Sequence, residues 1–232
     1  MPTLVLLPGM DGTGTLFSPL VDALSEAIST RIIRYPPTEA LDYRALASWV
    51  RDRLPTSEPC VLLGESFSGP IAIDIAASRP GNLIGVVLCC TFARSPARLT
   101  RWVPVRGMTA LLEHLPRALV SWTLLGRFRT DSLDHALRAA IVSVPAQVLA
   151  SRLYSVASVD VRTQLAAVGV PILQLVAARD RLVPRRSSRE IEKHAPGVTS
   201  VVIEAPHMLL QCRPDTAAQE ITRFIGGLGV QR

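Results

Sequence analysis

The sequence of 232 residues is poor in several residue types, and each shortage excludes a class of protein. Only four cysteines occur, and none has the CxxC spacing of a zinc site or a redox pair. No apolar run approaches the ~18 to 20 residues that a membrane span requires. The opening segment MPTLVLLPG has no basic part, so it does not resemble a signal peptide. We therefore expect a cytoplasmic protein without disulfides, metal or membrane span.

Lysine is nearly absent, since Lys193 is the only lysine among 25 basic residues and the arginines are spread along the whole chain. The formal net charge of +6 invites a nucleic-acid interpretation. However, aromatic residues make up only 5% of the chain, and no basic block is interleaved with them as a nucleic-acid-binding face usually requires. We therefore expect no nucleic-acid partner.

Short apolar runs alternate with helical spacing along most of the chain, which predicts a mostly parallel sheet with helices on both faces. The expected strands are 3–7, 31–35, 60–63, 84–90, 171–177 and 200–203, and the expected helices are 16–28, 41–54, 67–78, 185–194 and 215–225. Between about 92 and 165 only helical spacing occurs. We expect a single α/β domain over 1–232, with about six strands and an inserted helical segment at about 92–165.

The segment GESFSG (64–69) follows an apolar strand directly and leads into a helix. A sharp strand-to-helix turn needs small residues two positions before and two after its centre, and Gly64 and Ser68 provide them. Ser66 would then lie in strained backbone at the carboxyl edge of the sheet, where a helix N-terminus favours developing negative charge. A plain helix N-cap is the alternative role of Ser66. Strand and helix placement accounts for the neighbouring acids Glu65 and Asp74.

A serine hydroxyl needs an adjacent base, usually a histidine oriented by a carboxylate. Of the four histidines, only His207 follows a predicted strand at the carboxyl edge. Asp180 lies in the loop after strand 171–177, and the loop after strand 84–90 has no carboxylate. A turn or cap role is the alternative for Asp180. The order Ser66, Asp180, His207 matches three groups on successive loops, so we predict a catalytic triad.

These residues resemble the α/β-hydrolase superfamily over nearly the whole chain, and LLPGMDG (6–12) is similar to its first conserved loop, with Pro8 in place of a histidine. The resemblance implies that the backbone N–H groups of Met10 and Phe67 form an oxyanion hole. The glycine-rich turn is not followed by Gly-Lys-Ser/Thr, so we expect no nucleotide and no cofactor. Together, LPGxDGTG and GESFSG are most similar to a subset containing bacterial carboxylesterases and plastid esterase/acyltransferase-like proteins.

The resemblance also implies that the helical segment forms a cap over the site. Its large apolar residues predict an apolar acyl pocket, or else they only anchor the cap; they include Trp102, Met108, Trp122 and Phe128. Its start either contacts an anionic substrate such as an acyl-CoA or forms a solvated face, through Arg94, Arg98, Arg101 and Arg106.

We therefore expect a carboxylic-ester hydrolase that uses an acyl-enzyme intermediate on small to medium apolar acyl esters. Its partner would be a small-molecule ester, and a homo-oligomer is compatible with the sequence. An acyltransferase and a carbon–carbon bond hydrolase remain alternatives, because both reuse the same three residues. A catalytically silent hydrolase fold acting as a binding module is a further alternative.

Overall fold

The computed structural model describes residues 2–24, 28–96, 107, 109, 112, 114–195 and 197–228. Within them lies one sheet in the order β2-β1-β3-β4-β5-β6, and each neighbouring pair of strands is parallel. The strands are β1 (Thr3–Leu7), β2 (Thr30–Ile32), β3 (Cys60–Glu65), β4 (Leu83–Cys89), β5 (Ile172–Ala177) and β6 (Thr199–Ile203). The predicted mostly parallel sheet of about six strands is confirmed.

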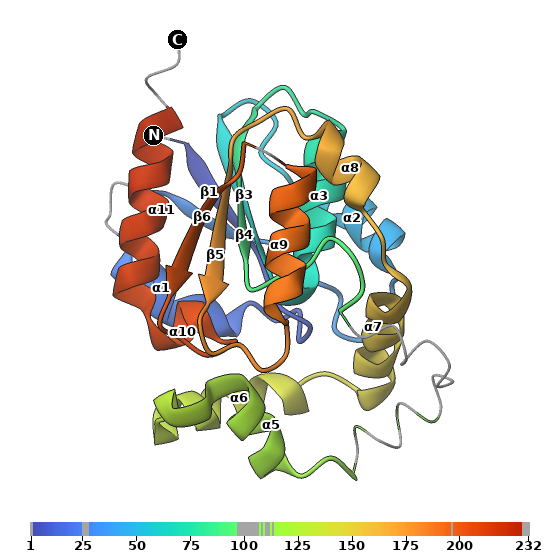
Figure 1. The fold of residues 1–232 in the computed structure, drawn as a ribbon. Coiled ribbons are helices and arrows are strands. Elements are labelled where there is room, and N and C mark those ends of the chain that lie inside the picture. The colour runs from blue at the N-terminus through green and yellow to red at the C-terminus, as the bar shows by residue number, and fades with distance from the viewer. Residues whose placement is uncertain are drawn as a thin grey trace.

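Helices cover both faces of this sheet (Figure 1). One face is covered by α2 (Tyr43–Arg51), α3 (Gly69–Ala77), α8 (Arg162–Ala167) and α9 (Arg185–His194), and the other by α1 (Ser18–Ala23) and α11 (Pro214–Leu228). Alternate residues of β1 supply both cores, because successive side chains of a strand point to opposite faces. Val5 and Leu7 pack in the first core, and Leu4 and Leu6 in the second.

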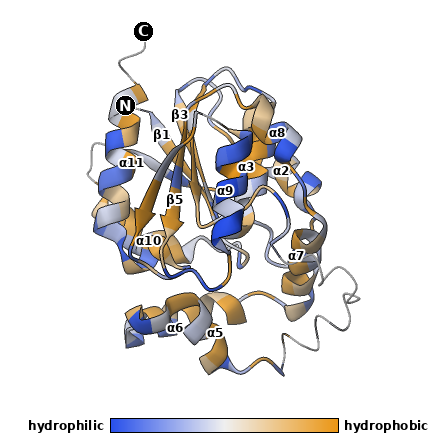
Figure 2. Ribbon diagram, viewed as in Figure 1, coloured by the Kyte–Doolittle hydropathy of each residue, from blue (hydrophilic) through white to orange (hydrophobic). Residues whose placement is uncertain are grey.

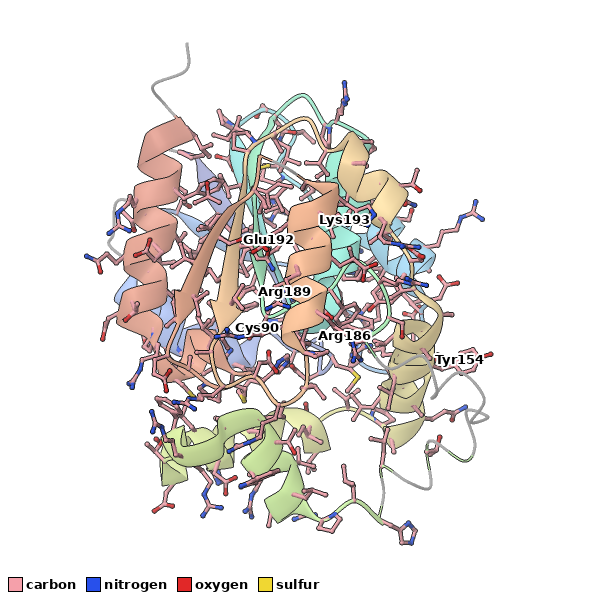
Figure 3. All side chains as sticks on the ribbon, in the orientation of Figure 1. Cys90, Tyr154, Arg186, Arg189, Glu192 and Lys193 are labelled. Carbon is pink, nitrogen blue, oxygen red and sulfur yellow. The ribbon has the colours of Figure 1, made fainter. Side chains whose placement is uncertain are left out.

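The extent to which each helix is buried decides how much of its surface is apolar. Helix α3 is almost wholly apolar (Figure 2) because it is flanked by α2 and α8 as well as by the sheet. Helix α9 buries Ile191 and exposes Arg189, Glu192 and Lys193 (Figure 3). Both helices therefore follow the rule that the apolar part of a helix faces the core.

The helical segment at 92–165 contains α5 (Arg117–Leu125), the 3-10 turn η4 (Gly126–Phe128), α6 (Asp131–Val142) and α7 (Ala146–Ser158), and α8 extends two residues past it. Its described residues form no strand, only a single bridge between Arg94 and Asp160. Helices α5 and α6 lie beyond the carboxyl ends of the strands (Figure 1). The division of the chain into one domain with a cap stays a prediction.

Several predicted helix boundaries were wrong. The first helix was expected over 16–28, but α1 ends at Ala23 because Leu24 has extended backbone, with ψ at 137°. The second helix starts at Tyr43 rather than residue 41, because the Asp42 side chain accepts a hydrogen bond from the Ala45 amide and caps it. The last helix continues from the expected residue 225 to Leu228. The short helix α10 (Leu209–Cys212) was not predicted.

Within the described ranges, no single helix is both long enough and apolar enough to cross a bilayer. The pair Asp131–Val142 and Ala146–Ser158 meets the length and composition criteria only when taken together, with a bend of 94° between them. Nor do three histidine, cysteine or acidic side chains gather around a common point among the residues described.

Candidate active site

Ser66 lies at the junction of β3 and α3, where the backbone turns through the 3-10 turn η2 (Ser66–Ser68). Its φ of 49° is a left-handed value that a serine rarely adopts. The turn is tight, since a Cβ on Gly64 would lie 2.8 Å from the Ser68 carbonyl oxygen and one on Gly69 would lie 2.0 Å from Thr91 Oγ1. Only glycine therefore fits at these two positions.

The three residues predicted to act together are brought together by this fold. Ser66 Oγ lies 2.8 Å from His207 Nε2, and His207 Nδ1 lies 2.8 Å from Asp180 Oδ2. Asp180 follows β5 and His207 follows β6, so all three side chains meet at the carboxyl edge of the sheet. The His207 and Asp180 side chains are only 6% and 7% exposed, which removes competing water from their contact.

The loop that follows β1 is held by an almost complete set of backbone hydrogen bonds. All five carbonyls of residues 8–12 accept one: Pro8 from Ser68 Oγ, Gly9 from the Gly12 amide, Met10 and Asp11 from Arg152, and Gly12 from the Tyr35 amide. The Met10 amide, by contrast, has no acceptor among the described residues. The loop is therefore rigid but keeps a free N–H donor.

Ser68 and Tyr35 join this loop to the turn at Ser66. The Ser68 hydroxyl donates to the Pro8 carbonyl and also bonds the Tyr35 hydroxyl, both in the interior. Phe67 is held between two rings, edge-on to Tyr35 at 6.3 Å and stacked on Tyr43 at 4.8 Å between centroids. The amide of Phe67 belongs to the first turn at a helix N-terminus, where backbone N–H groups lack helical acceptors.

Glu65 is buried beside the same site, and placement in β3 does not account for it as the sequence interpretation held. Its Oε1 accepts a 2.9 Å hydrogen bond from Gln211 Nε2 on α10. Burial raises the pKa of Glu65 to about 7, against the opposing effects of the Gln211 bond and the Gly9 amide. The carboxyl thus connects three segments: the loop after β1, the turn at Ser66 and the helix after His207.

Arg152 is a second residue that the sequence reasoning missed. On its helix α7, Arg152 is buried together with Leu149 and Val156, whereas the apolar Leu153 is only half-buried. A signal was present, because Arg152 stands three residues after Leu149 and four before Val156, on the apolar stripe of α7. A charged residue at that spacing indicates a specific buried partner.

Methionines connect the site to the helical segment. Met10 packs against Val144, Val148 and Leu149, and Met208 packs with Leu125 and Leu137. The loop after β1, which holds Met10, and the loop that holds His207 and Met208 are therefore both packed against the helical segment.

Other residues singled out from the sequence have different surroundings. Trp122 is 56% exposed beneath the Arg181 guanidinium, and Phe128 lies between Arg127 and Arg213. Arg94 pairs with Asp160 and Glu190 at 3.8 and 3.7 Å. Five more lie outside the described residues: Arg98, Arg101, Trp102, Arg106 and Met108.

A serine in left-handed backbone after a central parallel strand, with histidine and aspartate from later strand ends, defines the class of α/β-hydrolases. A family model described as "Serine aminopeptidase, S33" matches residues 40–211, most of the chain. The chain therefore belongs to this family of α/β-hydrolases.

Known proteins agree with this placement. A pimeloyl-[acyl-carrier protein] methyl ester esterase from Aeromonas hydrophila is 28% identical over 97% of this chain and 96% of its own length. Phytyl ester synthase 1 of Arabidopsis thaliana is 30% identical over 51% of this chain and 17% of its own. The structure of a thermophilic esterase from Thermogutta terrifontis superposes with a TM-score of 0.83 at 20% identity, over 98% of this chain and 90% of that one. The chain is a serine hydrolase of esterase type.

Proposed function

We propose that the chain hydrolyses carboxylic esters with Ser66, His207 and Asp180 as its catalytic triad. The observation that carries this proposal is the pair of 2.8 Å contacts that joins the three side chains in series at a left-handed serine. Because Asp180 is an acceptor, His207 Nδ1 carries a proton and Nε2 is free to accept the Ser66 proton. This tautomer is the one that general-base catalysis requires.

In the first half of the reaction, Ser66 Oγ attacks the ester carbonyl carbon while His207 Nε2 takes its proton. The substrate oxygen becomes an oxyanion, and the amides of Met10 and Phe67 donate hydrogen bonds to it, typically contributing about 3 kcal/mol each. His207 then returns the proton to the leaving alcohol, which departs and leaves the acyl group on Ser66. Asp180 stabilises the imidazolium that forms in between.

In the second half, water takes the place of the alcohol. His207 removes a proton from the water, the resulting hydroxide attacks the acyl carbon, and the same two amides again bind the oxyanion. The tetrahedral intermediate then collapses, His207 returns the proton to Ser66 Oγ, and the carboxylic acid is released. These steps use only groups of the chain itself.

We assign the substrate class to esters of small to medium apolar acyl groups. Support comes from the apolar clusters that contain Met10, in the loop of the proposed oxyanion hole, and Met208, which follows His207 directly. We further propose that the helical segment 92–165 is a cap over this pocket. The relatives named as methyl ester esterases favour including methyl esters of medium-chain acids among the substrates tested. Oligomeric state and a cytoplasmic location stay predictions.

The proposal is tested by hydrolysis of p-nitrophenyl esters from acetyl to long acyl chains, together with the methyl esters. We expect turnover by the unmodified protein and a loss of several orders of magnitude for Ser66→Ala. Ser78→Ala is a matched control, because that hydroxyl only caps the end of α3. A modest loss for Ser66→Ala would overturn the assignment.

Acyl transfer is a second candidate, favoured by the partial match to a phytyl ester synthase. The same acyl-enzyme would then be resolved by an alcohol instead of water. Product analysis with added long-chain alcohols distinguishes the two activities. Ester products that form at the expense of free acid would support transfer, and equal acid yields with and without alcohol would contradict it.

A further inference from the structure

Arg152 is a buried cation without a carboxylate partner. Its side chain is 1% exposed, whereas Tyr154, two residues along α7, points to solvent (Figure 3). Among the described residues no carboxylate lies within 4 Å of its guanidinium, and the charge of Asp11 acts on it only from farther away; the guanidinium donates instead to the carbonyls of Met10, Asp11 and Pro36 at 2.8–3.0 Å. Burying an unpaired charge is costly, so this arrangement lowers stability relative to an ion pair. The hydrogen bonds from Arg152 to the loop after β1 indicate what the buried charge contributes to the protein.

These bonds fix the direction of the Met10 amide through two peptide planes. In a trans peptide the C=O and N–H groups point in opposite directions, and the described chain has no cis bond. Because the Asp11 carbonyl faces Arg152, the N–H of Gly12 points the opposite way, onto the Gly9 carbonyl at 3.0 Å. Because the Gly9 carbonyl faces Gly12, the Met10 N–H in turn points out of the turn.

The same series of peptide groups carries the polarising effect of the guanidinium to the Met10 amide. A guanidinium at the Asp11 carbonyl polarises that peptide and makes the Gly12 N–H a stronger donor. Its bond to the Gly9 carbonyl then polarises the next peptide and makes the Met10 N–H a stronger donor as well. Gly12 is required for this geometry, since its φ is 72° and a Cβ there would lie 2.7 Å from Arg152 Nη1.

We propose that Arg152 is a positioning residue for the oxyanion hole, which aligns and polarises the Met10 amide from the helical segment through the Asp11 and Gly9 carbonyls. This inference rests on the proposed function of Ser66 and adds a residue that acts through Met10 rather than on the substrate. Full activity would then also require that α7 is packed against the loop after β1, because the guanidinium belongs to that helix.

Steady-state kinetics of Arg152→Leu and Arg152→Lys test the proposal. Misplacing one oxyanion donor lowers kcat by about 100-fold, so we expect that loss for Arg152→Leu, with KM within about threefold of the unmodified value. A trifluoromethyl ketone, which forms an oxyanion on Ser66, should lose affinity by a similar factor. Arg152→Lys keeps the charge but not the fork of donors and should be intermediate. Arg138→Leu removes a surface cation of α6 that pairs with Asp134, and should change kcat less than twofold.

A folded Arg152→Leu protein with kcat within threefold of the unmodified protein overturns the inference, as does a raised KM with kcat unchanged. If only Arg152→Lys folds, a tenfold loss of kcat at unchanged KM supports the inference and a loss under twofold overturns it. Both outcomes are read at substrate saturation, so weaker substrate binding alone cannot produce the expected result.

A spectroscopic measurement separates this inference from the proposed function. The chain has four methionines, one of them the first residue, so ¹⁵N-methionine labelling isolates very few backbone amides. In the ligand-free protein, Arg152→Leu should shift the Met10 amide proton upfield, toward a weaker donor, and leave that of Met208 in place. An unmoved Met10 signal overturns the inference even where the enzyme is active. If the unmodified protein shows no ester turnover that depends on Ser66, that result overturns the proposed function alone.

Discussion

Asp180 uses its two carboxylate oxygens for different tasks. Oδ2 contacts His207 Nδ1, while Oδ1 accepts from the backbone amides of Leu182 and Val183 at 2.8 Å each. The two bonds from the backbone amides fix the carboxylate of Asp180, so that Oδ2 is the oxygen it presents to the imidazole. A carboxylate held in this way orients the histidine tautomer and stabilises its charged form.

Asp180→Asn separates these two tasks. The amide can still accept the two backbone bonds with its oxygen, but its NH₂ group opposes the His207 proton and forces the wrong tautomer. We expect kcat for ester hydrolysis to fall by at least about 1,000-fold at neutral pH, with a thermal midpoint close to that of the unmodified protein. The matched control is Asp160→Asn, which alters a carboxylate paired with Arg94 and Arg162. A loss below tenfold would contradict the role assigned to Asp180.

Glu65 gives stability a dependence on pH. Burial raises its pKa from 4.5 to about 7, so between these values the folded state holds a proton that the unfolded state has lost. The free energy of unfolding therefore decreases as the pH rises through this window, in total by on the order of 3 kcal/mol. Glu65→Gln keeps an acceptor for the Gly9 amide, and a rotated Gln211 can use its unpartnered Oε1 to accept from the new amide.

We expect urea unfolding of the Glu65→Gln protein to show a smaller decrease in stability between pH 5 and 8 than the unmodified protein. Glu58→Gln makes the same chemical change at an exposed carboxylate and should leave the pH dependence unaltered. Parallel pH profiles for the unmodified and Glu65→Gln proteins would show that Glu65 ionises with an ordinary pKa.

At the scale of elements, the junction of β3 and α3 depends on the absence of side chains. Gly69 lets α3 start beside Thr91, whose hydroxyl donates to the Ser66 carbonyl. The sequence predicted this strand–turn–helix unit because small residues at fixed spacing are visible in it. It did not predict the bonds of Ser68 to Pro8 and Tyr35, because those partners lie far away in sequence.

Gly69→Ala places a methyl group into Thr91 and must displace either α3 or the loop after β4. Overpacking of this kind usually destabilises by about 1–3 kcal/mol, and the shift of the Ser66 carbonyl should also lower kcat. Gly81→Ala is the control, because a Cβ there meets nothing within 4 Å. Chemical denaturation and ester kinetics on both variants measure the two effects. Equal stability of the two variants would show that the junction yields without strain.

At the scale of the whole molecule, a parallel sheet places the ends of successive strands along one edge, so residues 66, 180 and 207 meet without being close in sequence. This rule made the three residues predictable from their positions after strands. The spacing of Arg152 on α7 indicates that it is buried, but the sequence does not predict the partners of Arg152 and Glu65, because these depend on how a strand end, α10 and α7 pack together. Helix ends such as that at Ala23 also depended on local backbone geometry rather than on apolar spacing.

The acyl-enzyme on Ser66 can be observed by rapid acid quenching of the reaction with a p-nitrophenyl ester, followed by mass spectrometry of the intact chain and its peptides. We expect one acyl group per chain, attached to Ser66, and no adduct on the Ser66→Ala protein. An acyl group on another residue, or ester turnover that persists in Ser66→Ala, would show that Ser66 is not the nucleophile.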